Sequence, residues 1–183
     1  MAEFRLIRGV KVLEQLNQLD ETTISQLQNN IRQLDTKKRQ FATDPITVTN
    51  ISMVPSVPSN VLEFKATTSS DGKKYDTTVM FMNVNFEDEE TGLNVTFTAS
   101  DDEEYNIEKI NLNRTNVKVR CTCLDFYHRF AEYNSRDGSL YGKAPAPYVP
   151  KTDRASSNPR KLPGLCKHLL KTVDGLRQAG LIS

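Results

Sequence analysis

The sequence lacks the features that would place the protein in a membrane or in an oxidising compartment. It contains no run approaching the roughly 18 apolar residues that a membrane-spanning helix needs. The opening residues, 1–15, have no hydrophobic core of the kind found in secretion signals. The chain has 3 cysteines, and this odd number, with two of them in a Cys-Thr-Cys run, is unsuited to a disulfide framework. We therefore expect a soluble protein of a reducing compartment such as the cytoplasm.

Recognisable catalytic patterns are also missing. With 2 histidines in the chain, we find no nucleophile-base set, no glycine-rich phosphate loop and no carboxylate pair beside a histidine. The acidic runs at 87–90 and 101–104 lack the alternating spacing and the glycine of an EF-hand loop, and we interpret them as solvated turns. We therefore predict that the protein is not an enzyme and takes no small-molecule substrate.

What the sequence does have is an uneven distribution of charge. The net charge is +1, yet residues 43–113 carry four basic and thirteen acidic side chains, and residues 114–183 carry thirteen basic and five acidic ones. Two interpretations remain open. The opposite charges could pair inside the fold, or they could bind a partner, either another subunit or an anionic molecule.

Residues 1–42 have the pattern of a helical region. Apolar residues recur at helical spacing over 12–19 and again over 24–34, and Thr23 with Gln26 matches a capping box at the start of a helix over about 23–40. A narrow apolar stripe on so polar a helix needs a partner. We expect either a hairpin with the first helix or a coiled-coil-like oligomerisation region.

Residues 43–114 have the pattern of an antiparallel β region. Apolar and polar residues alternate, valine, threonine, isoleucine and phenylalanine are abundant, and turn sequences such as Asp71-Gly72 divide the segments. The pattern predicts six strands, the last of which enters the next region: 46–53, 60–66, 75–86, 93–99, 106–112 and 116–123.

Residues 115–183 begin with a strand that carries two cysteines. Val117, Val119, Cys121 and Cys123 share one face of it, because side chains alternate along a strand. A short helix over 125–133, capped by Asp125, should follow. Next come a long loop over 138–165, punctuated by glycine and proline, and a last helix over about 166–179 that Gly180 ends.

Four residues of this region form a candidate zinc site: Cys121, Cys123, Cys166 and His168. Structural zinc takes four Cys and His ligands in a tetrahedron. A one-residue gap in a strand puts both sulfurs on one side, whereas the same gap in a helix separates two side chains by about 200°. Cys166 should therefore precede the last helix and His168 should lie in its first turn. The alternative is that the cysteines are small core residues; His128 is a surface residue or a substitute ligand.

The order Cys-x-Cys, gap, Cys-x-His resembles the SWIM-type zinc finger over residues 115–180. In that family the first pair lies on a β-hairpin and the second at the start of a helix. The 42 residues between Cys123 and Cys166 exceed the usual gap. The run from CTCLDFYHRFAEYN to NPRKLPGLCKHLL is also similar to a long-insert version found in structural proteins of tailed bacteriophages.

These observations predict an α+β fold with N-terminal helices, an antiparallel β-sheet in the middle and a zinc-stabilised strand-loop-helix at the C-terminus. The resemblance implies a non-enzymatic, zinc-binding subunit of a larger assembly such as a tailed-phage virion, in its neck, tail or baseplate. Other protein subunits would be its partners, in a homo- or hetero-oligomer, and a phage protein would reside in the virion after assembly in the host cytoplasm.

The alternative is a nucleic-acid-binding SWIM-type protein. Its basic side chains, interleaved with tyrosines, could follow a phosphate backbone. The candidate contacts with an anionic partner are Arg129, Lys143, Lys151, Arg154, Arg160 and Lys161.

Overall fold

The computed structural model describes residues 22–34, 45–89, 91–92, 94–146, 148 and 156–183. Its helices and strands are α2 (Ile24–Arg32), β1 (Thr47–Ser56), the 3-10 turn η3 (Val57–Ser59), β2 (Val61–Ser70), β3 (Lys73–Met82), β4 (Phe86–Glu87), β5 (Val95–Thr98), β6 (Glu104–Ile107), β7 (Val117–Cys121), α3 (Leu124–Arg129), α4 (Ala131–Arg136) and α5 (Lys167–Gln178). The predicted α+β class is confirmed. The first predicted helix, 12–19, lies outside the described residues. None of the described helices is long and apolar enough to cross a membrane.

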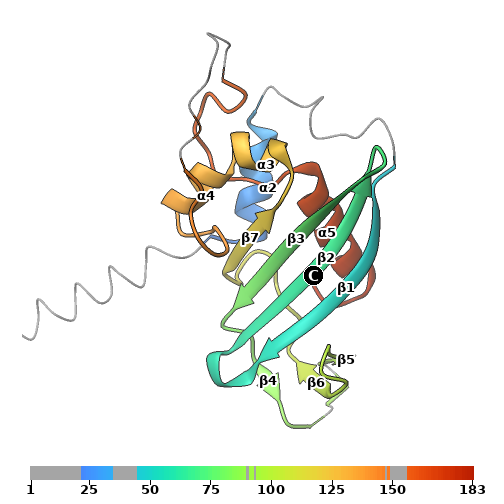
Figure 1. Ribbon diagram of the computed structural model, residues 1–183. Helices are drawn as coiled ribbons and strands as arrows, with labels where there is room; N and C mark the ends of the chain where they lie inside the picture. The colour runs from blue at the N-terminus through green and yellow to red at the C-terminus, as the bar shows by residue number, and fades with distance from the viewer. Residues whose placement is uncertain (1–21, 35–44, 90, 93, 147, 149–155) are drawn as a thin grey trace, which may run out of the picture.

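The main sheet is antiparallel, with strand order β1-β2-β3-β7 (Figure 1). Asp71 and Gly72 both have positive φ, 54° and 70°, which is the geometry of the tight turn that joins β2 to β3. The buried face follows the alternation expected of strands, so that Phe64 lies opposite Val79 and Val79 opposite Val119. Because β7 pairs with β3, the segment that carries the first two cysteines belongs to the same sheet as the acidic β region.

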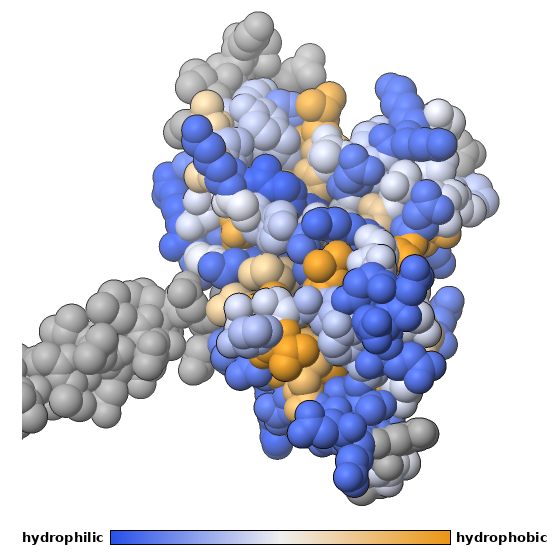
Figure 2. All heavy atoms as spheres, turned by 60° about the horizontal axis from the view of Figure 1, so that its bottom comes forward, coloured by the Kyte–Doolittle hydropathy of each residue, from blue (hydrophilic) through white to orange (hydrophobic). Residues whose placement is uncertain are grey.

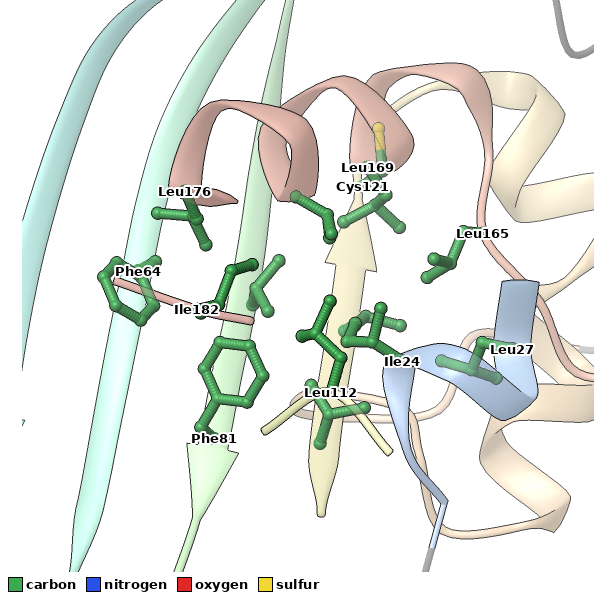
Figure 3. Packing of buried hydrophobic residues seen from close by; sticks show 14 of the residues in the cluster. Ile24, Leu27, Phe64, Phe81, Leu112, Cys121, Leu165, Leu169, Leu176 and Ile182 are labelled. Carbon is green, nitrogen blue, oxygen red and sulfur yellow. The ribbon is translucent and has the colours of Figure 1, made fainter. Parts of the chain in front are cut away.

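Helices α5 and α2 cover the buried face of this sheet. Helix α5 lies across the sheet and contacts all four of its strands (Figure 1). The side chains from both helices and from the sheet that meet in one layer include Ile24, Leu27, Phe64, Phe81, Leu169 and Leu176 (Figure 3). The predicted stop of α5 is confirmed, since Gly180 has φ 77° and the N–H of Leu181 donates to the carbonyl of Leu176 at 3.2 Å.

Helix α2 begins with the predicted capping box. The Thr23 hydroxyl accepts from the Gln26 N–H at 3.3 Å, and the Gln26 side chain accepts from the Thr23 N–H at 2.8 Å. The helix ends at Arg32, because a tight turn follows in which the N–H of Leu34 donates to the carbonyl of Ile31 and Leu34 is buried. The rest of the predicted helix, from residue 35 to about 40, lies outside the described residues. The apolar stripe of α2 therefore packs into the chain's own core.

A second, smaller sheet with strand order β4-β6-β5 forms what we call the acidic lobe, residues 86–108. The predicted strand 75–86 is interrupted after Met82, where Asn83 adopts a left-handed φ of 56°. The predicted strand 106–112 is wrong: β6 ends at Ile107, and beyond it a single bridge joins Ile110 to Ile182. The lobe lies at the opposite end of the molecule from α3 and α4 (Figure 1). Its end carries a largely hydrophilic surface (Figure 2).

Candidate metal centre

The first cysteine pair lies where β7 passes into α3. Cys121 is the last residue of β7, on the buried face, and Cys123 is the N-cap of α3 in an extended conformation. The sulfur of Cys123 accepts a hydrogen bond from the N–H of Phe126 at 3.3 Å. The predicted cap at Asp125 is therefore wrong, because Asp125 lies in the first turn and forms an ion pair with Arg129 at 3.1 Å. The predicted helix over 125–133 is two short helices, divided at Phe130.

The second pair begins α5. Cys166 is the N-cap, with extended φ −81° and ψ 170°, and His168 is the second residue of the helix. This confirms the prediction that Cys166 precedes the last helix and that His168 lies in its first turn. The preceding Gly164 permits a close approach, because a Cβ there would lie 2.7 Å from the ring of Phe130. Its N–H donates to the buried side chain of Asn134 at 2.9 Å.

The fold brings all four predicted ligands together. Their ligand atoms lie within 4.8 Å of one another, and Cys121 Sγ is 3.9 Å from His168 Nδ1. Sulfur ligands at 2.3 Å from a tetrahedrally bound zinc would be about 3.8 Å apart. All four residues are buried, with no more than 5% of each exposed. Cys121, Cys123, Cys166 and His168 could therefore hold a metal ion.

The pKa of each thiol in the cluster depends on the other two thiols. Hydrogen bonds from Cys121 and Cys166 lower the pKa of Cys123, and smaller contributions come from His168 and the N–H of Phe126. The hydrogen bond to the Cys123 thiolate raises the pKa of Cys121, and complete burial raises the pKa of Cys166. Without a cation, the cluster accordingly favours one thiolate and two thiols, since several negative charges in one buried site repel each other. A bound cation would offset this repulsion and allow all three thiols to ionise.

Neighbouring polar groups fix the elements around the cluster. The Thr77 hydroxyl of β3 and the Thr172 hydroxyl of α5 are 2.8 Å apart, and Thr172 also donates to the carbonyl of His168 at 3.1 Å. Lys167 Nζ donates to Ser70 at 3.1 Å and lies 3.6 Å from Asp71. These bonds connect the start of α5 to the β2–β3 hairpin.

The segment between the two pairs packs against the fold through buried amides. Asn158 donates to the carbonyls of Arg129 at 2.8 Å and Leu162 at 2.7 Å, and it accepts from the Leu162 N–H at 3.1 Å. Arg120, on the other face of β7, donates to the carbonyls of Tyr141 at 2.6 Å and of Lys143. The long loop of the sequence prediction is thus anchored at both its described ends.

The predicted anionic-partner contacts differ in their exposure among the described residues. Lys143, Arg160 and Lys161 are exposed, while Lys151 and Arg154 lie outside the described residues. The prediction of Arg129 as a surface contact is wrong: it is 1% exposed, and its guanidinium pairs with Asp125 and lies 4.4 Å from the centre of the Phe130 ring. We call residues 138–165, the predicted long loop, the insert.

Two aromatic contacts add to what the sequence indicates. His128 is exposed and takes no part in the cluster; its ring contacts that of Tyr148, with ring centres 4.3 Å apart and the planes inclined by 59°. Tyr75 of β3, by contrast, packs its ring 4.3 Å from that of His168. Sequence reasoning missed Tyr75; the available signal was its place on the same face of β3 as Thr77, Val79 and Phe81.

Comparisons with family models, with curated proteins and with solved structures find no match to this chain.

Proposed function

We propose that Cys121, Cys123, Cys166 and His168 bind one structural zinc ion and that the protein is a non-enzymatic subunit of a larger assembly. The observation that carries the metal assignment is a buried set of three thiols and one imidazole whose ligand atoms lie within 4.8 Å of one another. Zinc favours this ligand set, and structural sites fill all four positions with Cys and His. Four protein ligands leave no position for water, so the ion has a folding role and no catalytic one.

The position of the ligands supports that folding role. One pair ends β7 and begins α3, and the other begins α5, so an ion between them fastens the sheet edge to the covering helix. The 42 residues between Cys123 and Cys166 would then form a closed loop. Binding energy at such a site becomes folding energy, because the unfolded chain holds no preformed site.

The separation of charge supports a role as a subunit. The acidic lobe, residues 86–108, contains nine acidic residues and no basic one. Among the described residues, the ion pairs formed are Lys65–Glu63, Arg129–Asp125, Arg136–Glu132, Lys167–Asp71 and Arg177–Asp174. These pairs include no acid of the lobe, so its charge is available to a cationic partner. The basic residues Lys143, Arg160 and Lys161 are exposed elsewhere on the molecule.

With the resemblance to SWIM-type fingers and to long-insert phage proteins, we place the chain in a tailed-phage virion, as a neck, tail or baseplate component. Its partners would be other protein subunits, and it would enter the particle during assembly in the host cytoplasm. Complementary charge gives subunits an orientation and speeds their encounter.

Binding to nucleic acid is the second candidate, and one observation favours it. The rings of Tyr127, His128 and Tyr148 follow one another in contact, with centres 4.9 Å and 4.3 Å apart, and the last two side chains are exposed. Such rings could stack with unpaired bases. A gel shift at low salt tests it: absence of binding to single- and double-stranded DNA and RNA would end this candidate.

Native mass spectrometry with and without a chelator tests the main proposal. We expect one zinc per chain and an oligomer at low ionic strength, and we expect the chelator to remove the metal and to expand the charge-state distribution as the fold loosens. A compact monomer without metal, purified with zinc present throughout, would overturn the proposal.

A further inference from the structure

The imidazole of His168 has an environment that the metal assignment alone does not explain. Its Nδ1 lies 3.9 Å from Cys121 Sγ, on the side of the thiols. Its Nε2 is buried and has no hydrogen-bond partner among the described residues. A metal-bound histidine nearly always donates its second ring N–H to an acceptor, which fixes the tautomer and the ring orientation. Something other than a hydrogen bond must therefore orient this ring.

Tyr75 is in contact with that ring. The ring centres of Tyr75 and His168 are 4.3 Å apart, and the planes are inclined by 30°. Tyr75 is on the buried face of β3 two residues before Thr77, and Thr77 is the residue paired with Cys121. Because β7 ends at Cys121, the Tyr75 ring projects past the end of that strand and over the cluster.

The backbone of Tyr75 is firmly held. Its carbonyl accepts from the Thr68 hydroxyl at 3.1 Å. At the next residue, the Asp76 N–H donates to the Thr122 hydroxyl at 3.0 Å, and the Asp76 carbonyl accepts from the Thr122 N–H at 3.0 Å. Thr122 lies between the first two cysteines, so these bonds fix the Tyr75 ring relative to the thiols.

The backbone of His168 is held as well. It lies in the first turn of α5, and its carbonyl accepts from Thr172. The freedom left to His168 is rotation about its side-chain bonds, and that rotation decides which ring nitrogen faces the sulfurs. The Tyr75 ring, in contact with the imidazole at a tilt of 30°, opposes that rotation, since a turn of the imidazole would drive its edge into the neighbouring ring.

We propose that Tyr75 is a positioning residue for the metal site: its ring takes the place of the missing hydrogen bond to Nε2 and holds His168 with Nδ1 toward the three cysteines. The inference rests on the proposed metal function and deepens it. It has a specific consequence. The aromatic ring of Tyr75 is needed and its hydroxyl is not, so phenylalanine should serve and an aliphatic residue of similar size should not.

The experiment compares Tyr75→Phe and Tyr75→Leu with the wild type. Tyr105→Leu is the matched control, because Tyr105 is also a half-buried strand tyrosine with a stacked partner, Phe97, at 6.0 Å, in the acidic lobe. Zinc affinity is measured by competition with a zinc-binding dye. The tautomer of His168 is read from the ring nitrogens in two-bond ¹H–¹⁵N spectra of the zinc-loaded proteins, which are simple because the chain has 2 histidines.

We expect Tyr75→Leu to lower zinc affinity by about 10- to 100-fold, the range for lost support of a metal ligand. Its His168 signals should broaden or show both nitrogens as ligands. Tyr75→Phe and Tyr105→Leu should retain wild-type affinity and a single tautomer with Nδ1 bound. Either wild-type affinity and a single tautomer in Tyr75→Leu, or equal weakening by Tyr75→Phe, would overturn the inference. A wild-type protein that binds no zinc would instead overturn the proposed function, and the inference with it.

Discussion

The region around the metal cluster and the acidic lobe are built by different means. At the cluster, hydrogen bonds between buried polar groups join segments that are far apart in sequence, as between Asn158 and Arg129 or Thr77 and Thr172. In the lobe, most side-chain bonds join residues close in sequence and are solvent-exposed, as between Tyr105 and Asp101 at 2.9 Å or Thr96 and Asn106 at 2.7 Å. An exception is the Ser100 hydroxyl, which donates to the carbonyl of Met53 at 2.8 Å. The first region depends on groups that must all be satisfied at once. The second depends on short-range strand pairing over a few apolar side chains.

The difference indicates where each part gains its stability. Segments that are far apart in sequence lose much conformational entropy when they meet, and 42 residues separate Cys123 from Cys166. A metal ion can supply the missing free energy in one step. The lobe needs no such device, because its strands are close in sequence. Removing the metal should therefore affect the two regions unequally.

The largest expected effect is that of losing the metal. Structural zinc contributes on the order of 10 kcal/mol of apparent binding free energy in small domains, so chelation should strip protection from α3, α5 and the insert. Hydrogen exchange with mass spectrometry should show this loss at 117–136 and 156–180, with a smaller change over 86–108. Equal loss of protection in both regions would contradict the comparison.

The two histidines provide a matched pair of variants that tests which of them binds the metal. His168→Ala removes a ligand and should abolish stoichiometric zinc binding at micromolar metal. His128→Ala removes an exposed ring that contacts Tyr148 and should leave zinc binding unchanged. If His128→Ala weakened zinc binding as much as His168→Ala, the ligand assignment would be wrong.

The next largest effect is a pH dependence. Lower pH should weaken zinc binding, whereas higher pH should destabilise the metal-free fold. Raised pKa values at Cys121 and Cys166 mean that zinc must displace two protons in the metal-free protein. Zinc affinity should therefore fall by about 100-fold for each unit that the pH is lowered, tenfold per proton. A dye competition between pH 8 and pH 6 measures the slope, and a flat profile would exclude thiolate ligands.

The metal-free protein should respond in the other direction. A thiol whose folded pKa is raised contributes stability that is fully present below its ordinary pKa, here 9.0, and that is lost as the pH rises through the raised value. Urea unfolding of the chelated protein should thus show a falling free energy above pH 9. A free energy that rises there would contradict the burial of Cys166 in the metal-free fold.

Sequence reasoning predicts which four residues form the cluster, because the placement of each pair is local. The alternation in β7 and the break before α5 each constrain a pair of residues, and both are visible in a few letters. The capping box of α2 and the turn at Asp71-Gly72 are local in the same sense. Tyr75 and the burial of Arg129 depend instead on which segments meet in space. A basic residue such as Arg129 is expected at the surface from sequence alone. Its burial follows from contacts that the sequence does not reveal, with Asn158 at its carbonyl and Asp125 at its guanidinium.

The third effect is steric and belongs to the cluster region alone. Gly164→Ala would put a methyl group 2.7 Å from the Phe130 ring, in a buried turn two residues before Cys166. Overpacking of this kind costs about 1–3 kcal/mol of folding free energy. Gly175→Ala is the control, because a Cβ there meets nothing within 4 Å, and in the interior of a helix it should stabilise by about 0.5–1 kcal/mol. Thermal unfolding of zinc-loaded protein separates the two variants, and equal shifts would place Gly164 outside the close packing described.

The smallest expected effect on folding is that of charge reversal, which tests whether the two ends of the molecule bind each other between subunits. Glu103 and Glu104 of the lobe and Arg160 and Lys161 of the insert are exposed, so replacing either pair should change stability by no more than about 0.5 kcal/mol. Self-association should respond far more. Glu103→Lys with Glu104→Lys places basic side chains on both sides of the proposed contact, and Arg160→Glu with Lys161→Glu places acidic side chains on both sides of it.

Each double variant should be monomeric at low salt in sedimentation velocity, because like charges then face each other, whereas an equimolar mixture should associate as the wild type does. Added salt should dissociate the assemblies of the wild type and of the mixture, since exposed charges are screened over about 10 Å at 0.1 M. Lys73→Glu with Lys74→Glu changes the net charge equally at an exposed site at the start of β3, and it should associate normally. Association of either charge-reversed variant by itself would show that the two ends do not meet, and the separation of charge would then serve a partner other than a second copy.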